Sequence, residues 1–413
     1  MYSQQPPQQQ QSHSIAVTPE TPLINTQGDP IAHDIELEDS TKFLNHPIFY
    51  SVFLGCIAFI ISAITSYVSI EYYAPSSSGY TVISAFSILP CILAPFIIHK
   101  ITQKITLILC LLLLVISFFI NQYSNNGVLI FGRFLVSFST ELSAICILSV
   151  LVLVNWDTKR INQLFCLYYL VSYALQISNS YITDIYYKVV SSNFLIAFIL
   201  VAIIYAAVLA QPKRDSINNK LNPLHTIHHR YFAEKENNFA LLLPLLLFFG
   251  FGYILFVPFY AAVAVIPITI LLERYGRLRV FQILMGIALI SVVTAFILAY
   301  TYNIVFVDGF VYGYTSGAYK GFYYMCTISF SIFTAGTLLI LNSMVSTGSV
   351  FDKEKIVAVL SAFKGAQALG TFLYSICIFY ISPWVGWYLF VILYVVGCVL
   401  FMIFLKVKGQ HCC

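Results

Sequence analysis

The sequence predicts an all-α membrane protein with twelve transmembrane helices in two six-helix bundles. Hydrophobic residues make up 59% of its 413 residues, and charged residues only 9%. Soluble domains carry about 25% charged residues, so this composition indicates a polytopic membrane protein, and no nucleic-acid partner is expected. Apolar runs of about 20 residues, the length that crosses a bilayer, recur along the whole chain.

Twelve of these runs are expected to be membrane spans. They cover 48–70, 80–98, 104–121, 128–154, 163–187, 193–210, 239–257, 258–272, 279–300, 323–345, 356–381 and 384–405. Spans 7 and 8 are shortened, and Pro258 is the expected turn between them. One tilted, kinked helix over 239–272 is the alternative, and it would place the C-terminus on the opposite side of the membrane.

The basic residues favour the twelve-span topology. With twelve spans, all but four of the 21 Lys and Arg residues fall in segments on one side of the membrane. The exceptions are Lys188 and Lys320 in loops on the other side, and Arg133 and Lys364 within spans. Because Lys and Arg gather in cytosolic segments, both termini are expected to be cytosolic.

The remaining segments are polar. Residues 1–46 form a Gln- and Pro-rich tail that is expected to be disordered. The N-terminal bundle covers 47–210, a cytosolic linker 211–238, the C-terminal bundle 239–406 and a short cytosolic tail 407–413. The motif PETPLI and the acidic run after it, both in the first tail, loosely resemble an acidic dileucine sorting signal.

The two halves look like repeats of each other, as in many transporters. The turn HKITQK between spans 2 and 3 corresponds to ERYGRLR between spans 8 and 9. Asp157 before span 5 and Asp352 before span 11 hold the same place in each half, and each could cap a helix start.

Five residues of the second turn resemble a known motif. Glu273, Arg274, Tyr275, Gly276 and Arg277 resemble the D-R-x-G-R loop of the major facilitator superfamily, with Glu in place of Asp. His99 and Lys100 are a degraded copy of it in the first half. The resemblance covers about 47–406 and implies the major facilitator fold. It also implies that these turns, with Asp157 and Asp352, act as gating loops.

A finer resemblance concerns spans 4, 5 and 11. The stretches GRFLVSFSTELS, NWDTKRINQLFCLYYLVSYALQISNS and IVAVLSAFKGAQALGTFLYSI resemble the family of major facilitator superfamily domain-containing protein 1. This family implies a lysosomal uniporter that exports dipeptides and works with a glycosylated accessory membrane subunit. This chain has no N-x-S/T glycosylation acceptor, which is consistent with an accessory subunit that carries the glycans for both proteins. The endosomal and plasma membranes are the other compartments considered.

The chain departs from that family at three places. The fifth-span arginine that is thought to contact the peptide aligns with Tyr173. Ser137, Ser139 and Thr140 replace the glycines of the fourth-span motif, so helix packing there is expected to be looser. The region between spans 7 and 8 is also shorter than in the family.

Charged residues inside spans are the leading candidates for a substrate site, because burying a charge in a bilayer is costly. Arg133, Ser137 and Glu141 are spaced four and four, so they lie along one side of span 4. Glu141 could carry a proton or hold a substrate amino group, or it could make a structural hydrogen bond. Arg133 could pair with a substrate carboxylate or with Glu141, or its side chain could reach the membrane interface.

Lys364 on span 11 is the only basic residue deep in the second half, and it could face Glu141. Together they would offer a dipeptide one partner for its ammonium and one for its carboxylate. Reaching the cytosolic interface is the alternative for Lys364. Tyr169, Tyr173 and Gln176 line one side of span 5 and suit a polar pocket, although ordinary aromatic packing would also explain them.

These observations predict a carrier that works by alternating access on a small organic solute, most concretely a dipeptide or an amino acid. A proton-coupled carrier of another solute and a transport-inactive scaffold or receptor are the alternatives. No cofactor or metal is expected. His225, His228 and His229 match one box of membrane di-iron enzymes, but those sites need about eight histidines, and the other five here are scattered singly.

Overall fold

Span-length apolar helices dominate the computed structural model of the chain. The structure describes residues 47–72, 77–120, 126–154, 160–174, 203, 239–302, 317–346, 351 and 356–409. Within these ranges all regular elements are helical, and six helices are long and apolar enough to cross a membrane by length and composition. The tail 1–46, the linker 211–238, Gln176, Asp157, Asp352 and the histidine box lie outside the described residues, as does span 6 apart from residue 203.

The helices of the first half agree with the predicted spans. They are α1 (Pro47–Tyr72), α2 (Ser77–Phe86), α3 (Ile88–Ile101), α4 (Gln103–Ile120), α5 (Asn126–Val154) and a helix over residues 161–174 that begins span 5. Span 2 is divided into α2 and α3 at Ser87. Pro90 lies three residues further on. Its ring and missing N–H disfavour a continuous helix there, so proline explains the break.

The helices of the second half show that spans 7 and 8 are separate. They are α9 (Phe239–Phe251), α10 (Pro258–Tyr302), α11 (Gly317–Ser346), α12 (Ile356–Ile376) and α13 (Pro383–Gly409). A 3₁₀ turn at Tyr253–Leu255 follows α9, and Pro258 begins α10, so the single-helix alternative for 239–272 is wrong. α10 contains spans 8 and 9, joined at Gly276, which has φ 75° and ψ 168°.

The thirteen residues of α9 make it about 20 Å long, too short to cross a hydrocarbon core of about 30 Å. Backbone groups beyond its end still need partners in that setting. The hydroxyl of Thr371 on α12 donates to the carbonyl of Gly250 at 3.0 Å. The hydroxyl of Ser331 on α11 accepts from the N–H of Val257 at 2.8 Å. Two hydroxyls from neighbouring helices therefore provide hydrogen-bond partners for backbone groups at the break between spans 7 and 8.

Close glycine contacts hold α9 against α12. A Cβ added at Gly250 would lie 1.8 Å from the carbonyl oxygen of Gln367, and one added at Gly370 would lie 2.2 Å from that of Leu247. Small residues of this kind let helix backbones approach closely in membranes. Buried aromatic rings of α9, α11 and α13 pack beside this contact, with the rings of Phe248 and Phe390 4.7 Å apart.

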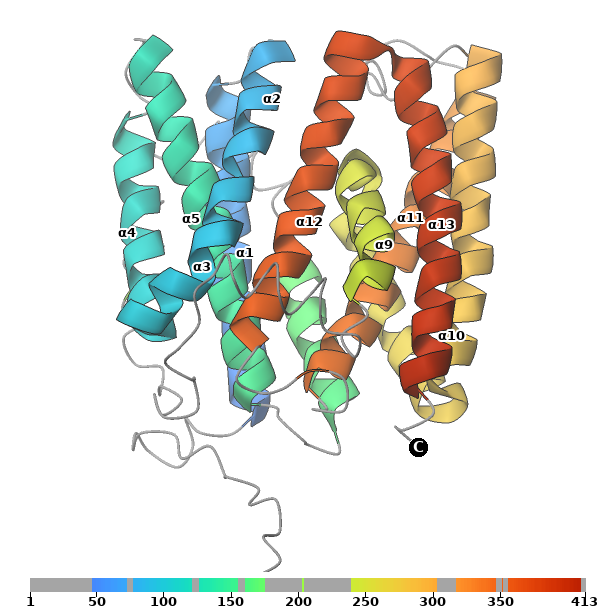
Figure 1. The fold of residues 1–413 in the computed structure, drawn as a ribbon, viewed down its shortest axis with the longest axis horizontal. Coiled ribbons are helices and arrows are strands. Elements are labelled where there is room, and N and C mark those ends of the chain that lie inside the picture. Colours follow the sequence, from blue (N-terminus) through green and yellow to red (C-terminus); the bar gives the residue numbers. More distant parts are fainter. Residues whose placement is uncertain are drawn as a thin grey trace, which may run out of the picture. The chain divides into compact units, whose positions relative to one another are not determined.

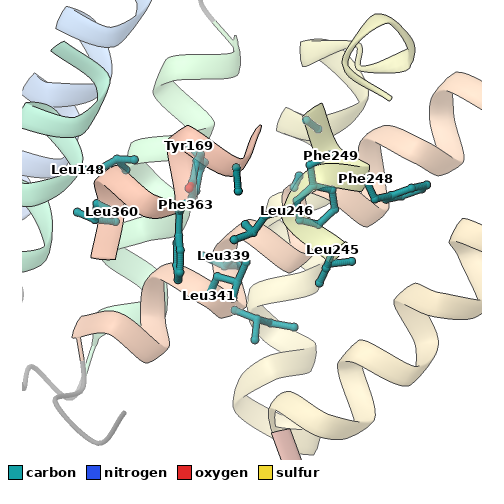
Figure 2. Packing of buried hydrophobic residues seen from close by; sticks show 14 of the residues in the cluster. Leu148, Tyr169, Leu245, Leu246, Phe248, Phe249, Leu339, Leu341, Leu360 and Phe363 are labelled. Carbon is teal, nitrogen blue, oxygen red and sulfur yellow. The ribbon is translucent and has the colours of Figure 1, made fainter. Parts of the chain in front are cut away.

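α12 joins the two halves. It packs against α9 in its own half and against α2, α3 and α5 of the first half (Figure 1). Buried side chains continue through this contact, as Figure 2 shows for Leu148 of α5 beside Leu360 and Phe363 of α12. Span 11 therefore contacts spans 2 and 4, and Lys364 lies on the helix that makes the contact.

Candidate functional site

The site is built around α5, which is in contact with α1, α2, α3, α4 and α12. Glu141 and Arg133 are both half-buried on it. Eight residues separate them, which is about 12 Å along a helix. Ser137 between them is buried, with 6% of its surface exposed. The polar side of span 4 thus carries an acid, a hydroxyl and a base inside the fold.

Lys364 and Glu141 share one neighbour, Cys91 on α3. Both charges act electrostatically on the thiol of Cys91 on α3. Gly365, next to Lys364, packs against Cys91, because a Cβ added there would lie 3.4 Å from the Cβ of Cys91. An acid from the first half and a base from the second half therefore flank one buried side chain at the contact of spans 2, 4 and 11.

Tyr253 is a further neighbour of the acid. It belongs to the 3₁₀ turn after α9 and is 63% exposed, and the charge of Glu141 acts on it. Neither Tyr253 nor Cys91 could be selected from the sequence, because each lies in an apolar run and its proximity to Glu141 depends on tertiary packing.

Tyr169 and Tyr173 are more buried than a free pocket wall would be. They are 6% and 8% exposed, and their rings stack with centroids 5.3 Å apart. The side-chain amide of Asn342 on α11 donates a hydrogen bond to the hydroxyl of Tyr169. The ring of Tyr173 packs edge-on against Phe256, 5.4 Å between centroids. These tyrosines connect the halves, and Asn342 is a partner that sequence analysis missed.

The same side of span 5 carries further contacts between the halves. The amide of Gln163 donates to the carboxylate of Glu273 at 3.0 Å, in an exposed position. One turn further, the thiol of Cys166 lies near the hydroxyl of Thr269 on α10, which donates to the carbonyl of Val265 at 2.8 Å. Glu273 of the predicted gating loop therefore contacts the opposite half at the predicted cytosolic end.

The other predicted gating residues that the structure describes lie in two turns of matching backbone. Arg274 and Gly276 are exposed and Arg277 is half-buried in the turn within α10. His99 and Lys100 end α3, and Thr102 after them has φ 78° and ψ 155°, nearly the values of Gly276. The repeat of the two turns is confirmed, even though the first lacks the glycine.

The substituted glycine positions of span 4 are well packed. Ser139 is fully buried, and the hydroxyl of Thr140 shares a hydrogen bond with that of Thr65 on α1 at 2.9 Å. A hydroxyl pair thus joins spans 1 and 4 where the resembling family has glycines. Among the described residues, no group of three or more His, Cys, Asp or Glu side chains could hold a metal ion.

Comparison with known proteins shows the fold. No family model and no curated protein matches the sequence. The structure is similar to that of the human organic anion transporter MFSD10 (TETRAN), with 12% identity, a TM-score of 0.56, and coverage of 86% of this chain and 98% of that one. The proton:xylose symporter XylE, bound to 6-bromo-6-deoxy-D-glucose, matches with 10% identity, a TM-score of 0.56, and coverage of 86% and 93%.

A third solved structure, the transporter FucP in the outward conformation, matches with 10% identity, a TM-score of 0.55, and coverage of 86% and 98%. Identities this low carry the fold and not the substrate. The finer resemblance to the family of major facilitator superfamily domain-containing protein 1 stays a prediction. In its architecture, this chain is a multi-pass membrane protein with the major facilitator fold.

Proposed function

We propose that the protein carries a small organic solute across a membrane by alternating access, with its site at Glu141 and Lys364. The fold supports this, because its halves are two helix bundles that can rock about a central site. The site supports it as well, because the two charged residues belong to different halves and flank Cys91. A solute that binds both residues would couple its binding to the approach of the halves.

The opposite charges favour a zwitterionic substrate, such as a short peptide or an amino acid. Its ammonium group would bind the carboxylate of Glu141, and its carboxylate would bind the ammonium of Lys364. Arg133 supplies a second base along α5, so a peptide longer than an amino acid would also find a partner there. The observation that supports this substrate class is that Glu141 and Lys364, one from each half, both lie within electrostatic range of Cys91.

Dipeptide uptake into proteoliposomes tests the proposal. We expect saturable flux with the wild-type chain, and a loss of about tenfold or more for Glu141→Gln and for Lys364→Gln, because each removes a hydrogen bond to a charged group. Lys320→Gln is the matched control, since Lys320 is an exposed base at the start of α11. An N-acetylated dipeptide, which lacks the ammonium group, should be transported about equally by the wild-type chain and Glu141→Gln. A C-terminally amidated dipeptide, which lacks the carboxylate, should be transported about equally by the wild-type chain and Lys364→Gln.

The same vesicles separate the alternatives. Flux that needs an inward pH gradient and becomes gradient-independent in Glu141→Gln would identify a proton-coupled carrier in place of a uniporter. Saturable flux of other solutes without dipeptide flux would reject the peptide class. A chain that shows neither flux nor substrate-dependent thermal stabilisation would be a scaffold or receptor, and the proposed function would be wrong.

For the compartment, we propose the lysosomal or endosomal membrane, with a glycosylated accessory subunit as partner. Both rest on the sequence resemblance. Microscopy of the full chain beside a lysosomal marker tests the location, and the plasma membrane is the alternative outcome. Co-purification of a glycosylated membrane protein in a fixed ratio tests the partner, and a chain that purifies alone and transports would reject it.

A further inference from the structure

The turn between α3 and α4 contains an unusual group of polar atoms. The Nδ1 atom of His99, the hydroxyl of Thr102 and the side-chain nitrogen of Gln103 are all buried, and none has a hydrogen-bond partner in the described part of the chain. Gln103 is only 1% exposed. Leaving a buried donor unpaired costs about 1–3 kcal/mol, so three within five residues call for a ligand.

The backbone of the turn is also strained, and it leaves N–H groups of α4 without acceptors. Thr102 has φ 78° and ψ 155°, a region that is populated almost only by glycine and that costs about 1–3 kcal/mol for other residues. It stands at the N-cap position of α4, whose first turn has N–H groups without acceptors inside the helix. The hydroxyl of Thr102 does not cap them, because it has no hydrogen-bond partner among the residues that the structure describes.

The charge of the turn selects the sign of the ligand. Lys100 is exposed and Lys104 is half-buried, and α3 and α4 contain no acidic residue. The N-terminus of α4 adds the positive end of a helix dipole. The corresponding turn of the second half differs, because His99 there becomes Glu273, whose carboxylate accepts a hydrogen bond from Gln163. At the position of Glu273, the first turn has the imidazole of His99 in place of a carboxylate.

We propose that this turn binds an oxyanion of the phosphate type through Gln103, Thr102 and His99. The amide nitrogen of Gln103 can only donate, and the Thr102 hydroxyl and the His99 ring can each donate one proton. Together with the free N–H groups of α4 they form a donor cradle of the kind that binds phosphate at helix N-termini. The phosphate comes either from a lipid headgroup at the membrane surface or from free inorganic phosphate.

The first test uses the purified full-length chain and inorganic phosphate. Its melting temperature should rise saturably with phosphate and should not rise with sodium chloride at matched ionic strength. Gln103→Glu replaces the donor by a negative acceptor of the same shape, and should weaken the apparent phosphate affinity about tenfold or more. Gln282→Glu on the exposed side of α10 is the matched control and should leave the affinity unchanged.

The second test identifies the source of the phosphate. Native mass spectrometry should show more retained phosphatidic acid than phosphatidylcholine on the wild-type chain, with the difference lost in Gln103→Glu, if the ligand is a headgroup. A response to inorganic phosphate alone would assign the free anion. If Gln103→Glu folds poorly, both measurements are made on Lys104→Gln, which changes a residue at the edge of the turn.

Equal behaviour of the wild-type chain and both turn variants in both tests would overturn the proposal, as would an equal loss in Gln282→Glu. No transport is measured, so the outcome is independent of the proposed carrier function.

Discussion

The side-chain amide of Asn342 on α11 donates a hydrogen bond to the hydroxyl of Tyr169, and this bond joins the two halves of the fold. Both residues are more than nine-tenths buried, at 3% and 6% exposed. In such surroundings a polar group needs its partner, since water does not replace it. The bond therefore makes span 5 and span 10 interdependent, and it can be broken without removing either helix.

Tyr169→Phe should destabilise the protein by about 1–3 kcal/mol, because it leaves the amide of Asn342 buried without its acceptor. Denaturation of the purified chain, followed by circular dichroism, measures the loss. Tyr168→Phe is the control, since Tyr168 is equally buried, at 6%, but does not hold Asn342. Combining Tyr169→Phe with Asn342→Leu should restore part of the stability, and strict additivity would contradict a direct bond.

Glu273→Ala should favour a state that is open at the predicted cytosolic end, because it removes the acceptor of Gln163. The bond is exposed, so its contribution is at most about 1 kcal/mol, or roughly a fivefold shift in population. Labelling of Cys166 by a thiol reagent, in a chain whose other cysteines are replaced, measures the opening.

Gln163→Ala should increase labelling of Cys166 as much as Glu273→Ala does, and the double variant should add nothing. Lys406→Ala is the control, because Lys406 is an exposed charge on α13 away from this hydrogen bond. Labelling that rises equally in Lys406→Ala would mean that the Gln163–Glu273 contact does not restrain the halves.

Gly370→Ala should destabilise the protein by about 2–5 kcal/mol, or prevent its folding, because the added methyl group would overlap the backbone of α9. Gly250→Ala should have a similar effect. Gly286→Ala is the matched control, since nothing lies within 4 Å of a Cβ added there, and it should be neutral. The yield of monodisperse protein and its melting temperature measure the effect of each variant. A stable Gly370→Ala chain would contradict the close contact between α9 and α12.

Thr102→Gly should stabilise the protein by about 1 kcal/mol, because glycine adopts φ 78° without strain. Gly276→Ala should do the reverse at the equivalent turn, although a Cβ there would meet no neighbouring atom. Melting temperatures of the two variants, measured without phosphate, test the pair. Shifts of the same sign would mean that backbone strain does not govern these turns.

The sequence predicted the spans well because a bilayer fixes how long an apolar helix must be. It also predicted the turn at Pro258, since proline ends helices for local reasons. The break at Ser87 was missed, although Pro90 three residues later carried the same signal.

The substrate site stays a prediction. Glu141 and Lys364 stood out because charged residues inside spans are rare, and Lys364 was expected either to face Glu141 or to reach the cytosolic interface. Asn342, Cys91 and Tyr253 could not be selected, because a single sequence does not show which helices face each other. Tyr169 was expected either in a polar pocket or in ordinary aromatic packing, and its bond to Asn342 makes it part of the contact between halves.

The close contact of α9 with α12, at Gly250 and at Gly370, has a consequence for how the molecule can move. Because the backbones of α9 and α12 already touch, neither helix can slide or tilt against the other without overlap. Span 2, in contrast, loses its regular helical hydrogen bonding near Ser87, where the backbone angles stay helical (φ −66°, ψ −19°), and it packs against the same α12. We therefore expect the helices of the first half, and not α9 and α12, to bend during a transport cycle. During transport, spin-label distances between helices of the second half should stay constant. Distances between labels on α2 and α3, on either side of Ser87, should change.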